Sequence, residues 1–403
     1  MSPDVPTPRR RVLFIEQEIP HYRAGVLDAI ARGIDADFEF FSGIPPQRQA
    51  FLEKGEADLS YPVTPLRLHW FLRERLVFQN YWPALRRQRS AGPCAVILRH
   101  NPRSLLLLPF MRRCHQLGLP VLIWGQGFSR KRPFRPHRHP LDRLNLAIVR
   151  AARAYVAYSD EIRDQLSRHV NPAKIFTASN TLNLTHLVPV RQRLENEGKT
   201  RIRERLGLPA RHYLLFIGRL QARKRVDLFI SALARLQKQH GVDVGGIIIG
   251  QGPEEPQLRA QGVAEGVRHL HFAGAPNFVH AADWMMASDL LVIPGWLGLA
   301  VNHAFFFGLP VIGQRWDESL RQHGPEAAYI RHGENGLLAE AHQPESLVES
   351  VKAALQQHPA LSRSAREYFD THLDINRMVA GFRAAIDFAL PPPITADAPV
   401  GTR

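Results

Sequence analysis

The residues whose types and spacing could do chemistry gather between Leu214 and Leu338, where one arrangement recurs. A strand is followed by a glycine turn, and polar or basic residues come where the next helix should begin. The recurring segments read LLFIGRLQARKR, GGIIIGQGP, HLHFAGAP, LLVIPGWLGLAVNH and HGPEAAYIRHGENGLLA. In an open parallel sheet such turns meet at the carboxyl ends of the strands, where backbone N–H groups can hold a phosphorylated ligand. We therefore expect an anion-binding edge that includes Gly218, Gly250 and Gly274.

Arg219 and Lys224 are the strongest candidates for chemistry at that edge. Arg219 follows an apolar strand, and Lys224 lies across the turn into the next helix. Two cations there could neutralise a diphosphate and stabilise negative charge that grows on it during a reaction. The alternative is a solvated basic helix start, since Arg223 and Arg225 are neighbours. Because the helix dipole disfavours cations at this end, a bound anion explains these residues better.

A second loop, residues 295–298, carries two glycines before an apolar helix that should end near Gly308. The free N–H groups of Gly298, Leu299 and Ala300 would point at the same diphosphate. A packing turn under a buried helix is the alternative. That alternative accounts for the three phenylalanines at 305–307 but not for the paired glycines.

These motifs resemble the nucleotide-sugar-binding half of GT-B glycosyltransferases, in particular the retaining family 4 type. The family pattern G-R-L-x-x-x-K is present as Gly218, Arg219, Leu220 and Lys224, and the family's proline-rich loop and G-x-P-V ending span residues 294–311. The likeness is strong from about residue 213 to 340 and looser in the first half. It implies an α/β protein of GT-B architecture, with two Rossmann-like, doubly wound parallel-sheet domains facing a cleft.

The sequence departs from the family at two positions. Most relatives carry glutamates eight positions apart across the second loop and its helix, and alignment on residues 308–311 places Gly295 and His303 there. His303 could hydrogen-bond a ribose hydroxyl or a phosphate, or it could be a core residue of an apolar helix. Glu326, on the next loop, could replace the missing carboxylate or could belong to a surface turn.

The resemblance also implies site residues in the first half of the chain. His21 lies in the first strand-to-helix loop, which similar enzymes use for acceptor and donor contacts. Gln126, inside the segment WGQG, lies where relatives often place a polar side chain near the transferred sugar. Without the fold inference, both would be ordinary loop residues.

Two other motifs are discounted. Asp35 and Asp37 match the metal-binding D-x-D of another glycosyltransferase fold, but they precede a strand and read as a turn. Gly125 and Gly127 are a fragment of a dinucleotide fingerprint without its third glycine, which disfavours a nicotinamide oxidoreductase. No ligand cluster for a divalent cation is visible, so we expect no metal requirement and no cofactor beyond the nucleotide sugar.

Short β-rich runs alternate with helical stretches, which indicates parallel sheets covered by helices. The twelve expected strands are residues 12–16, 37–41, 95–99, 120–124, 155–158, 174–178, 213–217, 246–249, 269–272, 290–293, 310–313 and 336–338. We expect an acceptor-side domain over 1–190, a linker over 191–204 and a nucleotide-sugar domain over 205–370. Residues 371–390 should pack back on the first domain, and 391–403 should form a disordered tail by composition.

Composition sets further limits. The 403 residues carry a net charge of +15, of which +14 belongs to residues 1–200 and +1 to the rest. A strongly basic half suggests an anionic surface or ligand. Within it, residues 66–89 interleave aromatic and aliphatic residues with arginines, as either an amphipathic helix on anionic lipid or a core helix with a basic exposed side. Cys94 and Cys114 show no disulfide framework, and no signal or membrane-spanning segment is seen.

The function expected from these observations is retaining glycosyl transfer from a UDP-, GDP- or ADP-sugar to a saccharide or lipid-linked saccharide, in bacterial surface polysaccharide assembly. A cytoplasmic protein, peripheral on the inner face of the plasma membrane, would fit. A nucleotide-sugar epimerase of the same fold and a catalytically silent sugar-nucleotide-binding module stay open as alternatives. Nucleic acid is not expected as a partner, since no recognised binding module accompanies the charge.

Overall fold

The computed structural model describes residues 9–43, 60–73, 75–86, 93–128, 134–315, 323–341 and 343–390. These residues form two compact units. The first contains the described residues up to 128, Phe134–Ser179 and the chain from Asn376 onward, and the second contains Asn180–Ile375. Each unit is described by itself.

The first unit is built on a seven-stranded sheet in the order β3-β2-β1-β6-β7-β8-β9, with every neighbouring pair parallel. Residues such as Val12, Ile97 and Ile123 are fully buried, as expected for strands covered on both faces. The strands are β1 Arg11–Glu16, β2 Asp37–Ser42, β3 Val63–Pro65, β6 Cys94–Arg99, β7 Val121–Gly125, β8 Ala154–Ala157 and β9 Ile175–Thr177. The helices are α1 His21–Gly33, α3 Trp82–Arg86, α4 Leu107–Gln116, α5 Pro140–Ala151, α6 Asp160–Ser167, η2 Pro172–Lys174 and the last helix, α15 Ile375–Ala389.

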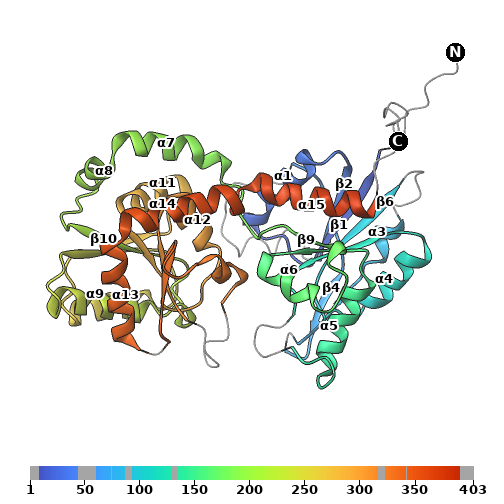
Figure 1. Cartoon of the computed structure of the whole chain (residues 1–403), viewed down its shortest axis with the longest axis horizontal. Helices are drawn as coiled ribbons and strands as arrows, with labels where there is room; N and C mark the ends of the chain where they lie inside the picture. The colour runs from blue at the N-terminus through green and yellow to red at the C-terminus, as the bar shows by residue number, and fades with distance from the viewer. Residues whose placement is uncertain are drawn as a thin grey trace, which may run out of the picture. The chain divides into compact units, whose positions relative to one another are not determined.

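The last helix belongs to the first unit although the chain reaches it from the second. In Figure 1 the red α15 lies beside the blue α1. The approach is close: a Cβ added at Gly33 would lie 2.6 Å from a Val379 methyl, and Arg383 donates to the Gly33 carbonyl. That residues 371–390 as a whole return to the first domain remains a prediction. Within this range, α15 is the part that packs on the first unit.

Residues 66–89 do not form the expected helix. They form an antiparallel hairpin, β4 Leu68–Phe71 and β5 Leu76–Gln79, followed by the short α3. Arg87 to Arg89 lie outside the described residues. The spacing of aromatic residues fits a helix as well as a hairpin, and the pairing of Val77 with Trp70 and with Ser104 decides for strands. The helical interpretation of this segment is therefore wrong.

The second unit is built on a six-stranded parallel sheet in the order β12-β11-β10-β13-β14-β15. Its strands are β10 His212–Ile217, β11 Val244–Ile249, β12 Leu270–Gly274, β13 Leu290–Val292, β14 Val311–Gln314 and β15 Gly336–Ala339. Its helices are η3 Thr185–Leu187, α7 Val188–Glu197, α8 Lys199–Arg205, η4 Ala222–Lys224, α9 Val226–Lys238, α10 Glu255–Ala264, α11 Phe278–Ala287, α12 Ala300–Phe306, η5 Pro325–Tyr329, α13 Pro344–Gln356, α14 His358–Tyr368 and the π-helical turn η6 Phe369–Leu373. Helices α9 and α13 pack together on one face of the sheet, and α7, α8, α11, α12 and α14 lie over the other (Figure 1).

All twelve expected strands are present, each within two residues of its expected bounds. The fold class is confirmed as α/β with two parallel-sheet units. Residues 191–204, expected as a linker, lie in α7 and α8, which pack on α11 inside the second unit. The expected disordered tail, residues 391–403, lies outside the described residues. None of the described helices has the length and apolar character needed to cross a membrane.

Candidate functional site

The glycine turns of the second unit stack against one another at the carboxyl edge of the sheet. Gly218 follows β10, Gly250 follows β11 and Gly274 ends β12, and all three have positive φ. Gly250 donates to the Gly274 carbonyl at 2.6 Å, and a Cβ at Gly250 would lie 1.8 Å from the Gly218 carbonyl oxygen. No side chain fits there. Glycine is required at position 250 because the backbones of the two turns are in contact, and this requirement holds whether or not a ligand binds.

Lys224 is buried beside this edge. It ends the 3-10 turn η4, its side chain is 6% exposed, and its Nζ donates to the Trp296 carbonyl at 2.8 Å. The same ammonium lies 4.6 Å from the centre of the Trp296 ring, and a Cβ at Gly218 would lie 3.6 Å from it. Among the described residues no carboxylate lies within ion-pair distance of Lys224. The sequence placed Lys224 at a helix start, and the structure brings it between the turn after β10 and the loop after β13.

The pKa of Lys224 is lowered to about 8, mainly by burial. The neighbouring Arg223 contributes to the lowering, while the negative charge of Glu326 opposes it. A buried ammonium without a carboxylate partner costs free energy in the absence of ligand. A bound anion would remove that cost, which is the electrostatic property expected of a phosphate site.

The loop after β13 is tied to the turn after β10 by its backbone. Gly295 donates to the Lys224 carbonyl at 3.1 Å and Trp296 donates to the Arg223 carbonyl at 2.8 Å. A Cβ at Gly295 would lie 2.3 Å from the Arg223 oxygen. Any side chain at 295, including the glutamate expected from the alignment, would therefore collide with the backbone of this turn.

The same loop also carries backbone donors without an acceptor among the described residues. Among the described residues, the N–H groups of Gly298, Leu299 and Ala300 have no acceptor, whereas Val301 and Asn302 donate to the carbonyls of Gly298 and Leu299. Arg219 is exposed, and its guanidinium makes no ion pair in the part of the chain that the structure describes. Lys224, Arg219 and these amides are positioned by neighbouring strand ends, β10 and β13.

The His303 side chain is buried by packing inside the second unit. It lies on α12, is 5% exposed and stacks on Phe278 with ring centres 4.1 Å apart and planes at 11°. Burial lowers its pKa to about 4, opposed by a hydrogen bond to the Leu299 backbone. The ring is therefore neutral at physiological pH. These contacts favour the core interpretation, and its contact with a ribose stays a prediction.

Glu326 is also buried, at 3% exposure on η5. The Asn180 amide donates to its Oε1 at 2.5 Å, and the Asn180 carbonyl accepts from Asn302 and Tyr329 at 3.0 and 3.2 Å. The carboxylate thus has a place inside the fold, not on a surface turn. Its negative charge also raises the pKa of Lys224.

The predicted residues of the first unit lie after its strands. His21 begins α1 after the loop that follows β1, and Gln126 is exposed directly after β7. Both follow the carboxyl ends of strands that flank β6. The role of each one stays a prediction.

A buried charged network at the same edge went unnoticed in the sequence. Glu16, the last residue of β1, accepts from Arg23 at 2.9 Å and lies 3.6 Å from the Arg99 guanidinium. Arg23 also donates to the Tyr158 hydroxyl at 2.8 Å and lies over the Trp124 ring at 4.4 Å. An acidic residue closing the apolar run RVLFI was the available signal. Each charge of the network meets an opposite one, so the network explains these residues as part of the fold without a ligand.

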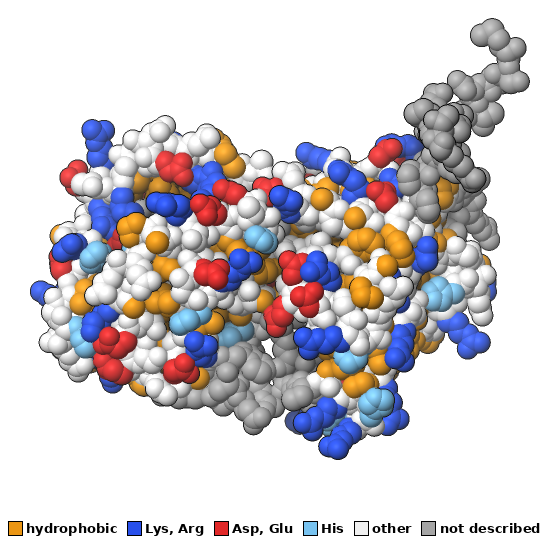
Figure 2. Space-filling model, viewed as in Figure 1, with side chains coloured by type: hydrophobic (Ala, Val, Ile, Leu, Met, Phe, Trp, Pro, Cys, Tyr) orange, Lys and Arg blue, Asp and Glu red, His pale blue; other side chains and the backbone are white. Residues whose placement is uncertain are grey.

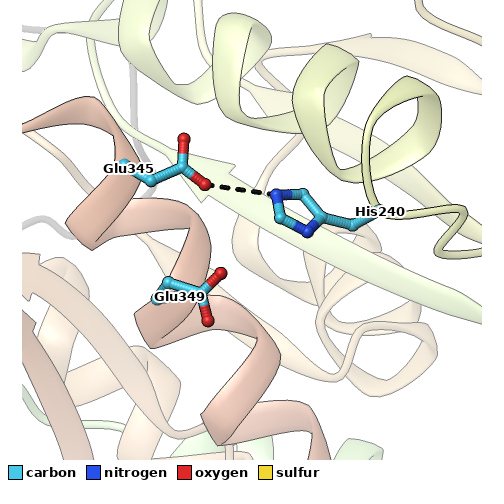
Figure 3. Close-up of side chains that lie close together, drawn as sticks. All are labelled: His240, Glu345 and Glu349. Carbon is cyan, nitrogen blue, oxygen red and sulfur yellow. Dashed lines mark hydrogen bonds and ion pairs between the residues drawn. The ribbon is translucent and has the colours of Figure 1, made fainter.

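A third cluster resembles a metal site in composition. Figure 3 shows His240, Glu345 and Glu349, whose ligand atoms lie within 4.8 Å of one another. Two cations already occupy the cluster: Arg235 pairs with Glu345 at 3.1 Å and Lys352 with Glu349 at 2.8 Å. The Lys352 ammonium also lies 3.2 Å from His240 Nδ1. The carboxylates are thus neutralised by side chains, and we assign no metal to them.

Solved GT-B glycosyltransferases share this fold of two parallel-sheet units. The chain aligns over 94% of its length with HepE of Anabaena, solved in complex with UDP, at a TM-score of 0.67 and 16% identity, covering 99% of that chain. It aligns over 93% with the lipopolysaccharide outer core galactosyltransferase WaaB at a TM-score of 0.62 and 15% identity, covering 99% of that chain. These similarities establish the fold.

Residues 211–357 match the family described as Glycosyl transferases group 1. D-rhamnosyltransferase WbpZ of Pseudomonas aeruginosa is 29% identical over 177 residues, which are 42% of this chain and 41% of the relative. A D-inositol 3-phosphate glycosyltransferase of Streptomyces bingchenggensis is 30% identical over 215 residues, 49% of this chain and 44% of the relative. The chain thus spans less than half the length of these two curated relatives.

Proposed function

We propose that the protein is a retaining glycosyltransferase whose second unit holds a UDP-, GDP- or ADP-sugar. Arg219, Lys224 and the amides of Gly298, Leu299 and Ala300 contact the diphosphate. The single observation that carries the proposal is Lys224, a buried ammonium that meets a backbone carbonyl but no ion-paired carboxylate among the described residues. Lys224 lies within residues 211–357, which match the family Glycosyl transferases group 1.

The chemistry follows from where charge develops. The bond between the anomeric carbon and the diphosphate oxygen breaks, and the acceptor oxygen bonds to the same face of that carbon. The departing diphosphate takes the proton of the acceptor hydroxyl, so no nucleophilic side chain is needed. Lys224 and Arg219 stabilise the negative charge that grows on the leaving group, an effect that is larger in a site shielded from water.

The acceptor in this proposal is a saccharide or lipid-linked saccharide, bound by the first unit with His21 and Gln126 among its contacts. Polysaccharide assembly at the cytoplasmic face of the membrane is the proposed setting. Support comes from the net charge of +14 on residues 1–200 and from the kinds of activity that the relatives' names describe.

A ligand screen tests the donor assignment. UDP-, GDP- and ADP-sugars are compared by thermal shift, because a ligand at 100 times its dissociation constant adds about 2.7 kcal/mol of stability. One base should stabilise the protein well beyond the other two. No stabilisation by any of them, at concentrations up to 10 mM, would contradict the proposal.

Turnover separates the proposal from its two alternatives. Donor consumption that strictly requires an acceptor argues against an epimerase, and release of free nucleotide from a donor argues against a silent binding module. Activity should also survive EDTA, because side-chain cations and amides neutralise the diphosphate. Loss in EDTA that manganese restores would contradict this part of the mechanism.

A further inference from the structure

The hairpin β4–β5 carries its most exposed apolar side chains at its tip. Phe71 is 48% exposed and Leu72 is 69% exposed, at the turn between the two strands. Leu105, 50% exposed, lies beside the hairpin because its N–H donates to the Val77 carbonyl. A protruding turn normally carries polar residues or glycine, so two large apolar side chains there indicate a surface that something else covers.

The backbone of the tip holds these side chains in place at a cost. Leu72 and Arg73 have φ values of 50° and 53°, in the left-handed region. Bulky residues rarely adopt this conformation, which costs about 1 kcal/mol or more per residue. The strain lies at the residues that expose the apolar surface, which fits a functional feature better than a neutral turn.

Three exposed arginines lie in the hairpin turn or beside the strand β5. Arg73, Arg75 and Arg103 are exposed, and none makes an ion pair among the described residues. Over residues 60–141 the sequence has fifteen lysines and arginines and a single acidic residue, Glu74. Figure 2 shows the same imbalance on one face of the first unit, where Lys, Arg and His side chains gather around α5 with few acidic neighbours.

We propose that this hairpin surface, formed by Phe71, Leu72, Leu105 and the arginines 73, 75 and 103, docks on an anionic lipid bilayer. Phe71 and Leu72 enter the headgroup region, while the arginines meet lipid phosphates. Apolar insertion flanked by cations is the combination that a negatively charged membrane surface selects. A nucleic acid would use the arginines but would gain little from an aliphatic side chain projecting from a turn.

Vesicle sedimentation with the full chain tests the proposal. Vesicles of phosphatidylcholine with 30% phosphatidylglycerol are compared with pure phosphatidylcholine at low and high salt. We expect binding to the anionic vesicles only, with release as ionic strength rises. Equal binding to neutral vesicles, or no binding to either, would overturn the proposal.

Three variants locate the contact. Arg73→Gln/Arg75→Gln should weaken anionic-vesicle binding about fivefold for each charge removed, and Phe71→Ser/Leu72→Ser about tenfold or more. The control is Val263→Ser, because Val263 on α10 is 83% exposed and lies in the second unit; its binding should not change. Wild-type binding by both hairpin variants, or equal loss by the control, would place the contact elsewhere.

Two readouts keep alternative causes apart. Melting curves establish that each variant is folded, and binding is measured without any sugar nucleotide, so failure of docking leaves the proposed glycosyl transfer untested and unharmed. Tight binding of a DNA or RNA oligonucleotide that depends on Arg73 and Arg75 but not on Phe71 and Leu72 would identify nucleic acid as the partner and overturn the lipid proposal.

Discussion

The two units treat charge at their strand ends in opposite ways. In the first, the Glu16 carboxylate pairs with the Arg23 and Arg99 guanidinium groups, which both donate to the Tyr158 hydroxyl, so the buried carboxylate meets opposite charge. In the second, the buried Lys224 ammonium meets only a backbone carbonyl and a tryptophan ring among the described groups in direct contact with it. Each member of a compensated network is needed by its partners in the fold, whereas an uncompensated cation is available to an anionic ligand.

The largest expected effect is on the compensated network. Glu16→Gln should destabilise the first unit by about 3 to 5 kcal/mol, because it leaves two arginines at this edge without their counter-charge. Calorimetric unfolding measures the loss. The matched control is Glu39→Gln, which breaks the more exposed pair with Arg11 and should cost about 1 kcal/mol or less. Equal effects of the two changes would show that burial of Glu16 does not matter.

Replacing the uncompensated cation, Lys224, should instead lower activity without lowering stability. Lys224→Met should lower glycosyl transfer about 100-fold, the effect of losing one preorganised charge of about 3 kcal/mol. The apo protein should unfold at no lower temperature, because the variant removes a desolvated ammonium. Arg219→Ala should lower turnover without changing the fold. Lys238→Met, an exposed lysine at the end of α9, is the control and should change neither property.

The next prediction concerns His303, a buried side chain that is neutral near pH 7. Its pKa of about 4 lies below the ordinary 6.5, so the folded state binds fewer protons than the unfolded state between these values. The contribution of neutral His303 to the free energy of unfolding is therefore fully present above pH 6.5 and is lost as the pH falls towards 4. His303→Phe should reduce this acid sensitivity in melting curves measured from pH 7 to 4.

Two further substitutions separate packing from ribose binding. His303→Ala should destabilise the apo protein by about 1 to 3 kcal/mol, and His303→Glu by more, because a buried carboxylate would lack a partner. Calorimetric titration with the preferred nucleotide supplies the second readout. An unchanged apo stability with weaker nucleotide binding in the alanine variant, partly restored by glutamate, would instead support the ribose contact.

The smallest expected effect is on the number of protons taken up when the nucleotide binds. With a pKa of about 8, Lys224 is mostly neutral at pH 8.5 in the free protein. A bound diphosphate favours the ammonium, so nucleotide binding should take up well over half a proton at pH 8.5 and little at pH 6.5. Titration calorimetry in two buffers of different ionisation enthalpy measures this uptake. The same uptake in Lys224→Met would assign the proton to another group.

The sequence by itself determined twelve of the thirteen strands in the two parallel sheets, and it missed only the edge strand β3. Twelve runs such as YLLFI and GIIIG are short, apolar and bounded by glycine or polar residues, and each became a strand of a parallel sheet. The glycine turns and the pair Arg219 and Lys224 could also be placed at the carboxyl edge from the sequence. Parallel strands bring these turns together whatever the details of packing, because all their carboxyl ends face one way.

Only the tertiary structure decided what the polar residues meet. The hairpin of residues 68–79 needed the pairing of Val77 with two separate segments, and a local pattern does not reveal such pairing. The stacking of His303 on Phe278, the burial of Glu326 against Asn180 and the contact of Gly295 with the Arg223 carbonyl join residues that lie 25, 146 and 72 positions apart. Burial and partner determine whether a polar side chain binds a ligand or supports the fold, and both are set by contacts between distant parts of the chain.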